Sequence, residues 1–365
     1  MPVLKKIIIQ DFRNIELQEL SFSPNVNCIW GGNGEGKTNL LDAVYYLSMT
    51  KSGIQGSDRF NFRHGCDSFA ISGDYSMQNG TSSRFSISVQ SGGEKKLRRD
   101  DKPCTRISDH IGLLPIVMVS PDDISLVSES GDGRRRFANG VISQMDRKYL
   151  SDVQTYLKLL AQRNRLLKES NPEDALLDAF DLAMEPCAQA VFERRREFCE
   201  RLAPLAGKFY RDISGGRESI SIKYRSELEG APLRELLREG RGRDKALHFT
   251  SSGIQRDDFI FEMDGFPIRK CGSQGQQKSF LVALKFAQYE MMKASYGFPP
   301  VLLLDDLFDK LDLDRVGNLL QMVAGSDFGQ IFLSDTNKTR TGALIDGLTA
   351  DRAYFKASGG CFTAI

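Results

Sequence analysis

Histidine and closely spaced cysteine are scarce in this 365-residue chain, and long hydrophobic runs are missing. The three histidines lie far apart, so a zinc site is not expected. The seven cysteines are odd in number and never spaced as CxxC, which fits free thiols in a reducing compartment. The isoleucines near the N-terminus end at Gln10-Asp11, far short of a signal-peptide core, and no apolar stretch has the length that spans a bilayer. We therefore expect a cytoplasmic protein without a membrane partner.

An excess of charge of either sign is also absent. Lys and Arg number 49 and Asp and Glu number 48, which gives a formal net charge of +1. Any surface that binds nucleic acid must therefore be a local patch. Because 41% of the residues are hydrophobic, the chain can bury a large core, and its length suggests two compact units.

A phosphate-binding motif lies between a strand pattern and a helix pattern near the start of the chain. The segment GGNGEGKT fits GxxxxGK[ST], follows the apolar run 26–30 and precedes a helical pattern that begins at Asn39. Glycines let backbone N–H groups turn toward phosphates, Lys37 can reach the β- and γ-phosphates, and the Thr38 hydroxyl suits Mg²⁺. A helix that starts here also directs its positive end at the nucleotide. The predicted nucleotide-binding residues are Gly31, Gly32, Asn33, Gly34, Glu35, Gly36, Lys37 and Thr38.

The hydrophobic pattern changes twice along the chain. Strand-like runs occur at 7–9, 26–30, 69–75, 85–89 and 116–119, and again at 220–224, 259–263, 301–304 and 331–333. Between them, apolar residues at helical spacing predict two long helices on either side of Asn171-Pro172, with Pro186 and Pro204 as candidate kinks. Such a pair predicts an antiparallel, coiled-coil-like hairpin. We therefore predict an α/β ATPase domain, residues 1–125 and 246–365, split in sequence by a helical lobe, residues 126–245.

A pair of acids follows an apolar strand far downstream. Residues 301–304 (VLLL) precede Asp305 and Asp306, which a parallel sheet would place at the same edge as the phosphate loop. As Walker B acids, Asp305 would hold Mg²⁺ through water, and Asp306 would polarise the attacking water or accept its proton. The predicted catalytic residues are thus Lys37, Asp305 and Asp306. Asp312, seven residues after Asp305, resembles the D-loop of ATP-binding-cassette (ABC) ATPases.

A second polar motif, GSQGQQK at 272–278, comes before the helical run 280–292. A serine and a glycine at a helix start offer a hydroxyl and backbone N–H groups to an anion. In cassette ATPases, the signature of one protomer closes over the γ-phosphate held by the Walker A loop of the other. We therefore predict that nucleotide state controls dimerisation and that ATP bound by a second copy is contacted by Ser273, Gln274, Gly275 and Gln276.

With these motifs, the chain resembles the RecF family of DNA replication and repair proteins, which are relatives of the SMC-like head domains. The resembling segments are 6–14, 31–48, 119–137, 162–168, 252–261, 272–285, 302–312 and 329–340. The resemblance implies an ABC/SMC-like P-loop ATPase head with ATP and Mg²⁺ as cofactors, an ATP-dependent homodimer and slow, DNA-dependent hydrolysis. It also implies binding to duplex DNA beside single-stranded gaps, without sequence specificity, and action with RecR and RecO to help RecA load.

Several positions depart from the wider cassette pattern. Asp306 stands where many relatives of the superfamily have Glu. Because the Asp side chain is shorter, its carboxylate would lie farther from the attacking water, which predicts slow hydrolysis. The switch histidine of transporter cassettes is replaced by Asp335 or Thr336, and Asp122 or Asp123 occupies the region of the usual Q-loop glutamine. Gln255 stands where many RecF proteins are expected to have His.

Basic clusters are the candidates for DNA contact, because the DNA backbone is met by Lys and Arg. Aromatic residues are not interleaved with these clusters, so we do not expect base stacking. We expect contacts to the DNA backbone that do not depend on sequence. The main candidates are Lys95, Lys96, Arg98 and Arg99, followed by Arg134, Arg135 and Arg136. The pair Arg241 and Arg243 is a further cluster, and Lys51 and Arg63 could face nucleotide or DNA.

Two other functions compete with DNA repair. The ATPase subunit of a membrane transporter shares the motifs, but the helical insertion between Lys37 and Ser273 is larger than such a cassette usually carries. A small-molecule kinase or GTPase would leave the signature unexplained, and residues 337–340 (NKTR) lack the acid that an NKxD guanine motif needs.

Overall fold

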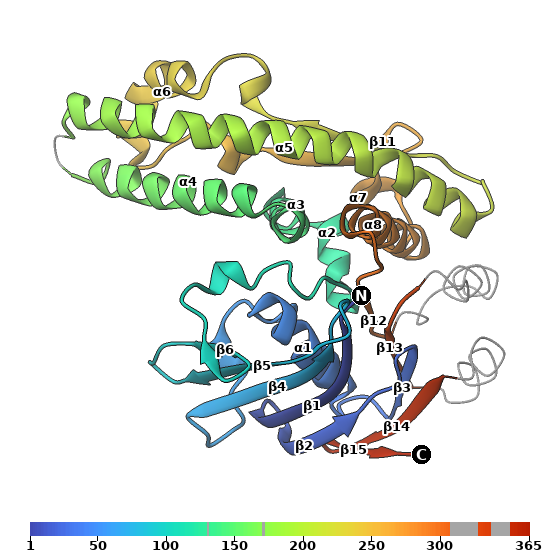
Figure 1. Ribbon diagram of the computed structural model, residues 1–365. Coiled ribbons are helices and arrows are strands. Elements are labelled where there is room, and N and C mark those ends of the chain that lie inside the picture. The colour runs from blue at the N-terminus through green and yellow to red at the C-terminus, as the bar shows by residue number, and fades with distance from the viewer. Residues whose placement is uncertain (130, 170–171, 307–327, 337–350) are drawn as a thin grey trace.

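The computed structural model describes residues 1–129, 131–169, 172–306, 328–336 and 351–365. Two β-sheets and helix α1 form a lower unit in Figure 1, and the long helices α4 and α5 form a layer above it. Helix α8 lies beside the junction of the two. Among the helices of the described ranges, none combines the length and the apolar character that crossing a bilayer demands.

The sheet that carries the phosphate loop has the strand order β15-β14-β3-β13-β12-β8. Its strands are parallel except for β15, and every residue of the central strands is buried. Parallel strands with both faces covered form continuous apolar runs, which is why three of them were predicted with their observed bounds. The strands are β3 (Val26–Trp30), β8 (Ile116–Val119), β12 (Val301–Leu304), β13 (Ile331–Asp335), β14 (Arg352–Ser358) and β15 (Cys361–Ala364).

A second, antiparallel sheet packs beside the first, with helix α1 (Lys37–Met49) contributing apolar residues to the core that they share. Its order is β2-β1-β4-β5-β6-β7. One face of the long strands is buried and the other is not, so apolar and polar residues alternate, most clearly in β5. The strands are β1 (Val3–Phe12), β2 (Ile15–Ser21), β4 (Ser68–Ser76), β5 (Ser82–Gln90), β6 (Lys96–Arg99) and β7 (Lys102–Pro103).

The predicted helix hairpin is confirmed. Helix α4 (Arg147–Leu166) packs along α5 (Asp174–Ser214), which continues through Pro186 and Pro204 for 41 residues, about 60 Å. Helices α2 (Ser125–Ser128) and α3 (Gly131–Met145) precede the hairpin, and a sheet of order β11-β10-β9 follows it. Its strands are β9 (Ile220–Arg225), β10 (Asp258–Met263) and β11 (Phe266–Pro267).

Three further helices pack with the lobe, and two of them, α7 and α8, come after residue 245, where the predicted lobe ends. Helices α7 (Ile268–Cys271) and α8 (Gln274–Tyr296) carry the signature segment. Helix α6 (Leu233–Leu247) was not predicted, because its sequence is rich in charge and its buried apolar residues are few. Short 3₁₀ turns include η3 (Pro121–Ile124), which follows β8.

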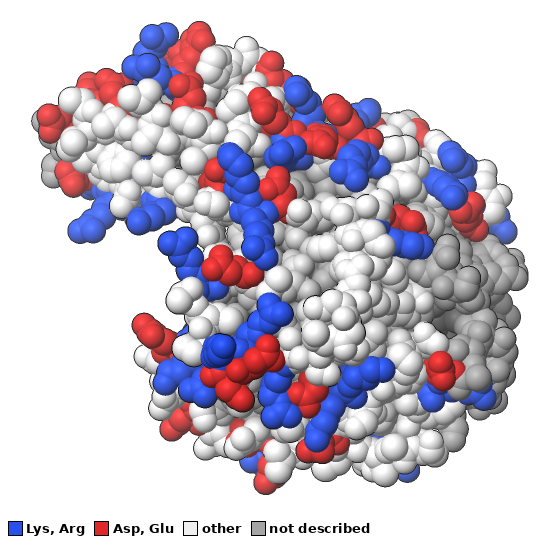
Figure 2. Space-filling view, viewed as in Figure 1, with Lys and Arg blue, Asp and Glu red and all other residues white. Residues whose placement is uncertain are grey.

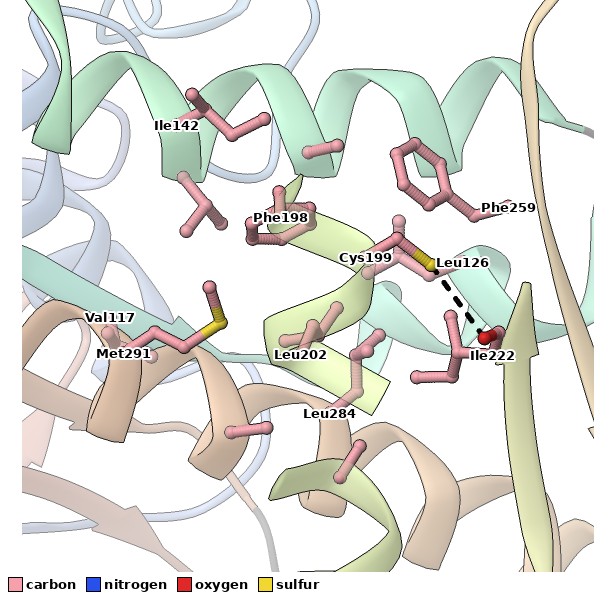
Figure 3. Close-up of a cluster of buried hydrophobic side chains, with 14 of the residues drawn as sticks. Val117, Leu126, Ile142, Phe198, Cys199, Leu202, Ile222, Phe259, Leu284 and Met291 are labelled. Atoms are coloured by element: carbon pink, nitrogen blue, oxygen red, sulfur yellow. Dashed lines mark hydrogen bonds between the residues drawn. The ribbon is translucent and has the colours of Figure 1, made fainter. Parts of the chain in front are cut away.

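One hydrophobic core runs from the phosphate-loop sheet into the helical lobe. Figure 3 shows Val117 of β8 and Met291 of α8 near Phe198 and Leu202 of α5. Burying such side chains stabilises each by roughly 1.5–3 kcal/mol. The sheet and the lobe therefore share packing through α8, instead of meeting at a polar surface.

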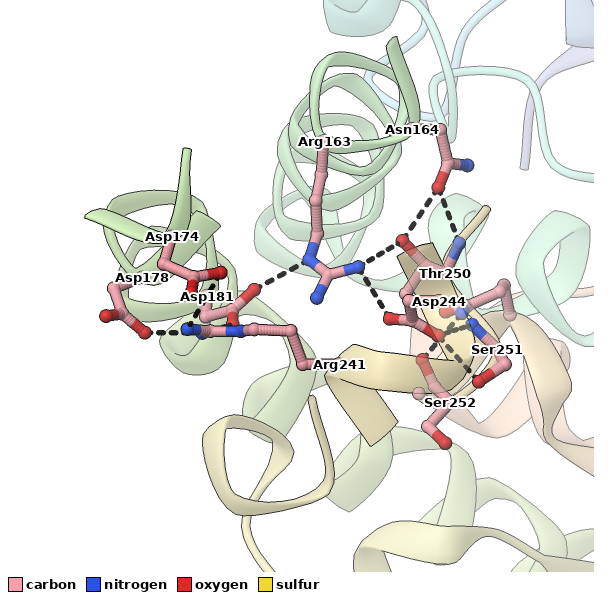
Figure 4. Close-up of polar contacts among 12 residues, drawn as sticks. Arg163, Asn164, Asp174, Asp178, Asp181, Arg241, Asp244, Thr250, Ser251 and Ser252 are labelled. Atoms are coloured by element: carbon pink, nitrogen blue, oxygen red, sulfur yellow. Dashed lines mark hydrogen bonds and ion pairs between the residues drawn. The ribbon is translucent and has the colours of Figure 1, made fainter. Parts of the chain in front are cut away.

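A buried ionic network holds α4, α5 and α6 together (Figure 4). The Arg163 guanidinium pairs with Asp181 of α5 at 2.7 Å and with Asp244 of α6 at 2.7 Å, and it also donates to Thr250. The side chains of all three charged residues are at most 1% exposed. Beside this cluster, Arg241 pairs with Asp178 and with Asp181.

Replacing Arg163 with Met should destabilise the protein strongly, because the buried Asp244 would lose its cation and the buried Asp181 would keep only Arg241. A loss of about 3–5 kcal/mol in the free energy of unfolding is expected for removing one partner of such a group. Urea denaturation followed by circular dichroism measures this loss. The control is Lys148→Met, which removes an exposed ion pair with Asp152 and should leave the midpoint almost unchanged. Equal midpoints for the two variants would show that the network contributes little.

Candidate functional site

The phosphate loop connects the end of β3 to the start of α1. Gly36 is the N-cap of α1 with φ 99°, in the left-handed region that glycine adopts most easily, and no side chain in the described part of the chain caps the helix. The first turn of α1 carries no acidic residue. The backbone N–H groups and the positive end of the helix dipole are thus available to an anion, as in phosphate sites at helix N-termini.

Close contacts explain the glycines at the two ends of the loop. A Cβ on Gly31 would lie 2.7 Å from the Ala357 carbonyl oxygen of β14, and one on Gly36 would lie 2.8 Å from the Asn14 side chain. The turn between β14 and β15 also holds the loop, since the Gly360 N–H donates to the Glu35 carbonyl at 3.0 Å. Gly32, Asn33 and Gly34 are exposed at the rim.

The Lys37 side chain lies across this loop. Its ammonium donates to the carbonyl oxygens of Gly31 at 2.8 Å and Gly32 at 2.9 Å, and the residue is only 4% exposed. These contacts hold the positive charge at the mouth of the loop, where the N–H groups of the α1 terminus also lie. The ammonium thus lies within the predicted phosphate loop, and phosphate binding by Lys37 stays a prediction.

Thr38 and Asp305 meet although they are far apart in the sequence. The Thr38 hydroxyl donates to one carboxylate oxygen of Asp305 at 2.7 Å, and the Ser334 hydroxyl donates to the other at 2.5 Å. Burial raises the pKa of Asp305 above its usual range, and the two hydroxyl donors and Lys37 oppose that rise. A hydroxyl and a carboxylate side by side beside a phosphate loop are suitable ligands for Mg²⁺, directly or through water.

Asp306 adopts an unusual backbone conformation beside Asp305. Its φ of 41° is in the left-handed region, and its N–H donates to the Ser334 hydroxyl at 3.0 Å. Non-glycine residues are seldom found there, and such strain tends to accumulate at functional sites. Asp335, one of the two switch candidates, ends β13 and is 2% exposed. The D-loop candidate Asp312 lies outside the described residues.

Two further residues at the site were not found from the sequence. Ser334 is brought to Asp305 by the parallel pairing of β12 with β13. Arg13, in the turn between β1 and β2, donates to Asn39 of α1 and pairs with Asp42 at 2.5 Å. Arg13 lies in the sequence FRN, which is part of a segment that resembles the RecF family. For Ser334, the sequence offered only an apolar run that ends in Ser-Asp.

The signature segment forms the N-terminus of α8. Ser273 is the N-cap, and it forms a capping box with Gln276: the Ser273 hydroxyl accepts from the Gln276 N–H at 3.3 Å, and the Gln276 side-chain oxygen accepts from the Ser273 N–H at 2.8 Å. Ser273 and Gln274 are exposed, and a Cβ on Gly275 would meet no atom of the described residues within 4 Å. The Gln276 amide also donates to Glu218 at 2.9 Å. This helix end can be approached from outside.

The basic candidates differ in what their side chains contact. Lys96, Arg98 and Arg99 are exposed on β6, whereas Lys95 donates to the Thr50 carbonyl and pairs with Asp58 at 2.9 Å.

The three arginines of α3 separate in the same way. Arg134 is 7% exposed and pairs with Asp258 at 2.9 Å, and Arg135 donates to the Asp257 carbonyl. Arg136 is 73% exposed and pairs with Asp132 of its own helix. Of these three, Arg136 alone has a guanidinium that is open to a phosphate in this conformation.

The segment SGIQRDD, residues 252–258, has a structural role in the lobe. Asp257 pairs with the buried Arg195 of α5 at 2.6 Å, and Asp258 holds Arg134. Gln255, whose role was open, accepts a hydrogen bond from the Tyr156 hydroxyl. Asp123, one of the two Q-loop candidates, pairs with Lys285 of α8 at 3.0 Å.

Comparison with known proteins shows one family. The family model for the RecF/RecN/SMC N-terminal domain matches residues 3–343. The DNA replication and repair protein RecF of Bacteroides thetaiotaomicron is 43% identical over 359 residues, 98% of this chain and 97% of the relative. The RecF protein of Porphyromonas gingivalis is 40% identical over 359 residues, 98% of this chain and 99% of the relative.

Solved structures agree with this assignment. A structure described as the recombination mediator protein RecF with ATP in the RecFOR pathway has a TM-score of 0.89 at 28% identity, covering 100% of this chain and 98% of its own. The Smc head domain of Pyrococcus furiosus, at 14% identity and a TM-score of 0.60 over 100% of this chain and 96% of its own, shares the fold. The predicted SMC-like head with an inserted helical lobe is confirmed. This chain belongs to the RecF family of DNA replication and repair proteins.

Proposed function

We propose that this protein is an ATP-switched, DNA-binding ATPase of recombinational repair. The observation that carries the proposal is the cluster of Lys37, Thr38 and Asp305, which joins a phosphate loop to a buried carboxylate within hydrogen-bond distance. A relative that covers the whole chain is described with ATP bound, and it belongs to the RecFOR pathway. The roles of RecR, RecO and recombinase loading are proposed from that relationship.

Each residue of the site has a part in binding ATP. The loop N–H groups and Lys37 would bind the phosphates, and Thr38 and Asp305 would hold Mg²⁺, which supplies charge neutralisation at the β- and γ-phosphates when bound. Asp306 would orient the attacking water or accept its proton. Because an aspartate is one methylene shorter than the glutamate of many relatives, slow hydrolysis is expected.

A second copy would complete the site. The exposed start of α8 offers the Ser273 hydroxyl and the positive end of the helix dipole to an anion, whereas the phosphate loop lies on the sheet unit (Figure 1). If α8 of one copy meets the γ-phosphate held by the other, ATP adds contacts that ADP lacks. ATP would then favour the dimer by differential binding.

A groove at the junction of the sheet unit and the lobe is the proposed path for DNA. It has a volume of about 790 Å³, and its lining includes Lys51, Arg136 and Lys285. Figure 2 shows a hollow between the helical arm and the lower unit, with Lys and Arg on both of its walls. Burial, and then the nearby charges of Arg136 and Lys95, lower the pKa of Lys51, so an anion there would relieve the repulsion among these cations.

Replacing Asp305 with Asn tests the metal site. The variant should lose Mg²⁺-dependent ATP binding, because a neutral amide is a poorer ligand for Mg²⁺ than a carboxylate. It should not lose stability without ligand: the raised pKa of Asp305 means that its ionised form opposes folding at neutral pH. This effect declines as the pH falls through the raised pKa and is gone below the ordinary pKa of a carboxyl group. Titration with a fluorescent ATP analogue, with and without Mg²⁺, and thermal melting measure both. An unchanged Mg²⁺ dependence would remove Asp305 from the site.

Replacing Ser273 with Arg tests the role of the second copy. A bulky cation at the exposed start of α8 should block closure on a partner while leaving ATP binding by the monomer intact. Light scattering with ATP measures dimerisation, and Lys37→Met serves as the comparison that loses ATP binding as well. A normal ATP-induced dimer of the Ser273 variant would refute the arrangement.

Reversing the charge of Lys51 and Arg136 tests the DNA path. The double variant with Glu at both positions should bind duplex DNA more weakly at all sequences, and the slope of log affinity against log salt should fall by about one for each phosphate that the protein no longer neutralises. The matched control is the double variant Arg201→Glu with Lys208→Glu, at two exposed cations of α5 that do not line the groove. If both variants lower binding equally, the effect is one of net charge, and the groove is not the path.

A further inference from the structure

The signature helix belongs to the helical lobe by its packing. Leu284 and Met291 of α8 lie in the same core as Phe198 and Leu202 of α5 (Figure 3). Ser273 begins this helix. The same core includes Val117 of β8 and Leu302 of β12, so the position of the signature depends on how α8 packs against both α5 and the sheet.

The Walker B edge extends toward α8 through strand β8. The Asp305 N–H donates to the Val119 carbonyl of β8 at 2.9 Å. In the turn η3, which follows, the Asp123 carboxylate accepts from the Ser120 N–H at 2.9 Å. Asp123 is thus fixed to the strand that borders the metal site.

An ion pair connects this edge to the signature helix. Lys285 of α8 contacts Asp123 at 3.0 Å, with side-chain exposures of 9% and 22%, and its ammonium lies 5.6 Å from the centre of the Phe137 ring. A pair so shielded from solvent is weakly screened, and losing one partner leaves the other charge in a poorly solvated place.

The surroundings leave room for this contact to change. Asp123 and Lys285 both line the groove of about 790 Å³, so open space lies directly beside the pair. A second contact, from the Ile116 N–H to the Gln144 side-chain oxygen at 3.1 Å, holds α3 to the other end of β8. The lobe is therefore tied to this strand at its start by a neutral hydrogen bond and beyond its end by an ion pair.

We propose that Asp123 and Lys285 are positioning residues that couple the ATP site to the signature helix. The pair sets the position of α8 relative to the Walker B edge, so that Ser273 is presented correctly to the ATP of a second copy. This inference rests on the proposed ATP-dependent dimer. Without the pair, the monomer still binds ATP, but ATP no longer drives association efficiently.

Four variants test the coupling: Asp123→Asn, Lys285→Met, the charge exchange Asp123→Lys with Lys285→Asp, and the control Lys293→Met. Lys293 lies on the same helix, and its ion pair with Glu290 stays within α8. For the two single variants, ATP affinity of the monomer should stay within about twofold, while ATP-induced dimerisation should weaken about 10-fold, within the range of typical coupling between sites. The control should match the unaltered protein, and the charge exchange should recover most of the dimerisation.

A purely structural ion pair gives a different result. ATP binding and dimerisation of the single variants would then fall together, without recovery in the charge exchange. A lower melting temperature alone does not separate the two cases, because losing either partner leaves a poorly solvated charge. Either that pattern, or normal dimerisation by both single variants, overturns the inference. If Lys285→Met does not fold, Asp123→Asn decides, because Asp123 is the more exposed partner. An unaltered protein that never dimerises with ATP would refute the proposed function, and this inference with it.

Discussion

The Asp305 carboxylate is the point on which the site depends, because it joins three segments that the chain keeps far apart. Thr38 at the start of α1 and Ser334 at the end of β13 both donate to it, at 2.7 and 2.5 Å. Parallel pairing of β12 and β13 with each other, and of β13 with β3, brings their carboxyl ends to one edge. Burying an acid there raises its pKa, and the hydroxyl donors oppose that rise. A cation placed beside the carboxylate would favour its charged form further.

The helical lobe is organised by buried arginines. Arg163 joins α4 to α5 and α6, Arg195 joins α5 to Asp257, and Arg134 joins α3 to Asp258 at the start of β10. Each of these contacts joins one helix to a fixed position on a neighbouring segment, which apolar packing specifies less sharply. Several segments that resemble the RecF family, including QRNRLLK and SGIQRDD, thus serve the construction of the lobe that carries α8.

The sequence predicted the sheet edge and the helix hairpin well, and it predicted individual contacts poorly. Strands β3, β8 and β12 were bounded correctly because strands covered on both faces are continuous apolar runs. Helix α6 was missed because its polar surface hides a short apolar face, and it is held by the buried Asp244. Ser334 and Arg13 depend on which strands are neighbours, and local patterns do not give that order. Arg134, a candidate for DNA contact, turns inward to an acid 124 residues away, a pairing that composition cannot reveal.

The central claim is that two copies of this chain enclose ATP, each supplying part of both sites. The most direct test is the mass of the unaltered protein in solution, by light scattering, with ATP and Mg²⁺, with ADP and Mg²⁺, and without nucleotide. The account predicts a dimer with ATP and a monomer in the other two conditions, with the dimer lost as ATP is hydrolysed. A protein that binds ATP tightly and yet keeps one mass in all three conditions would contradict it.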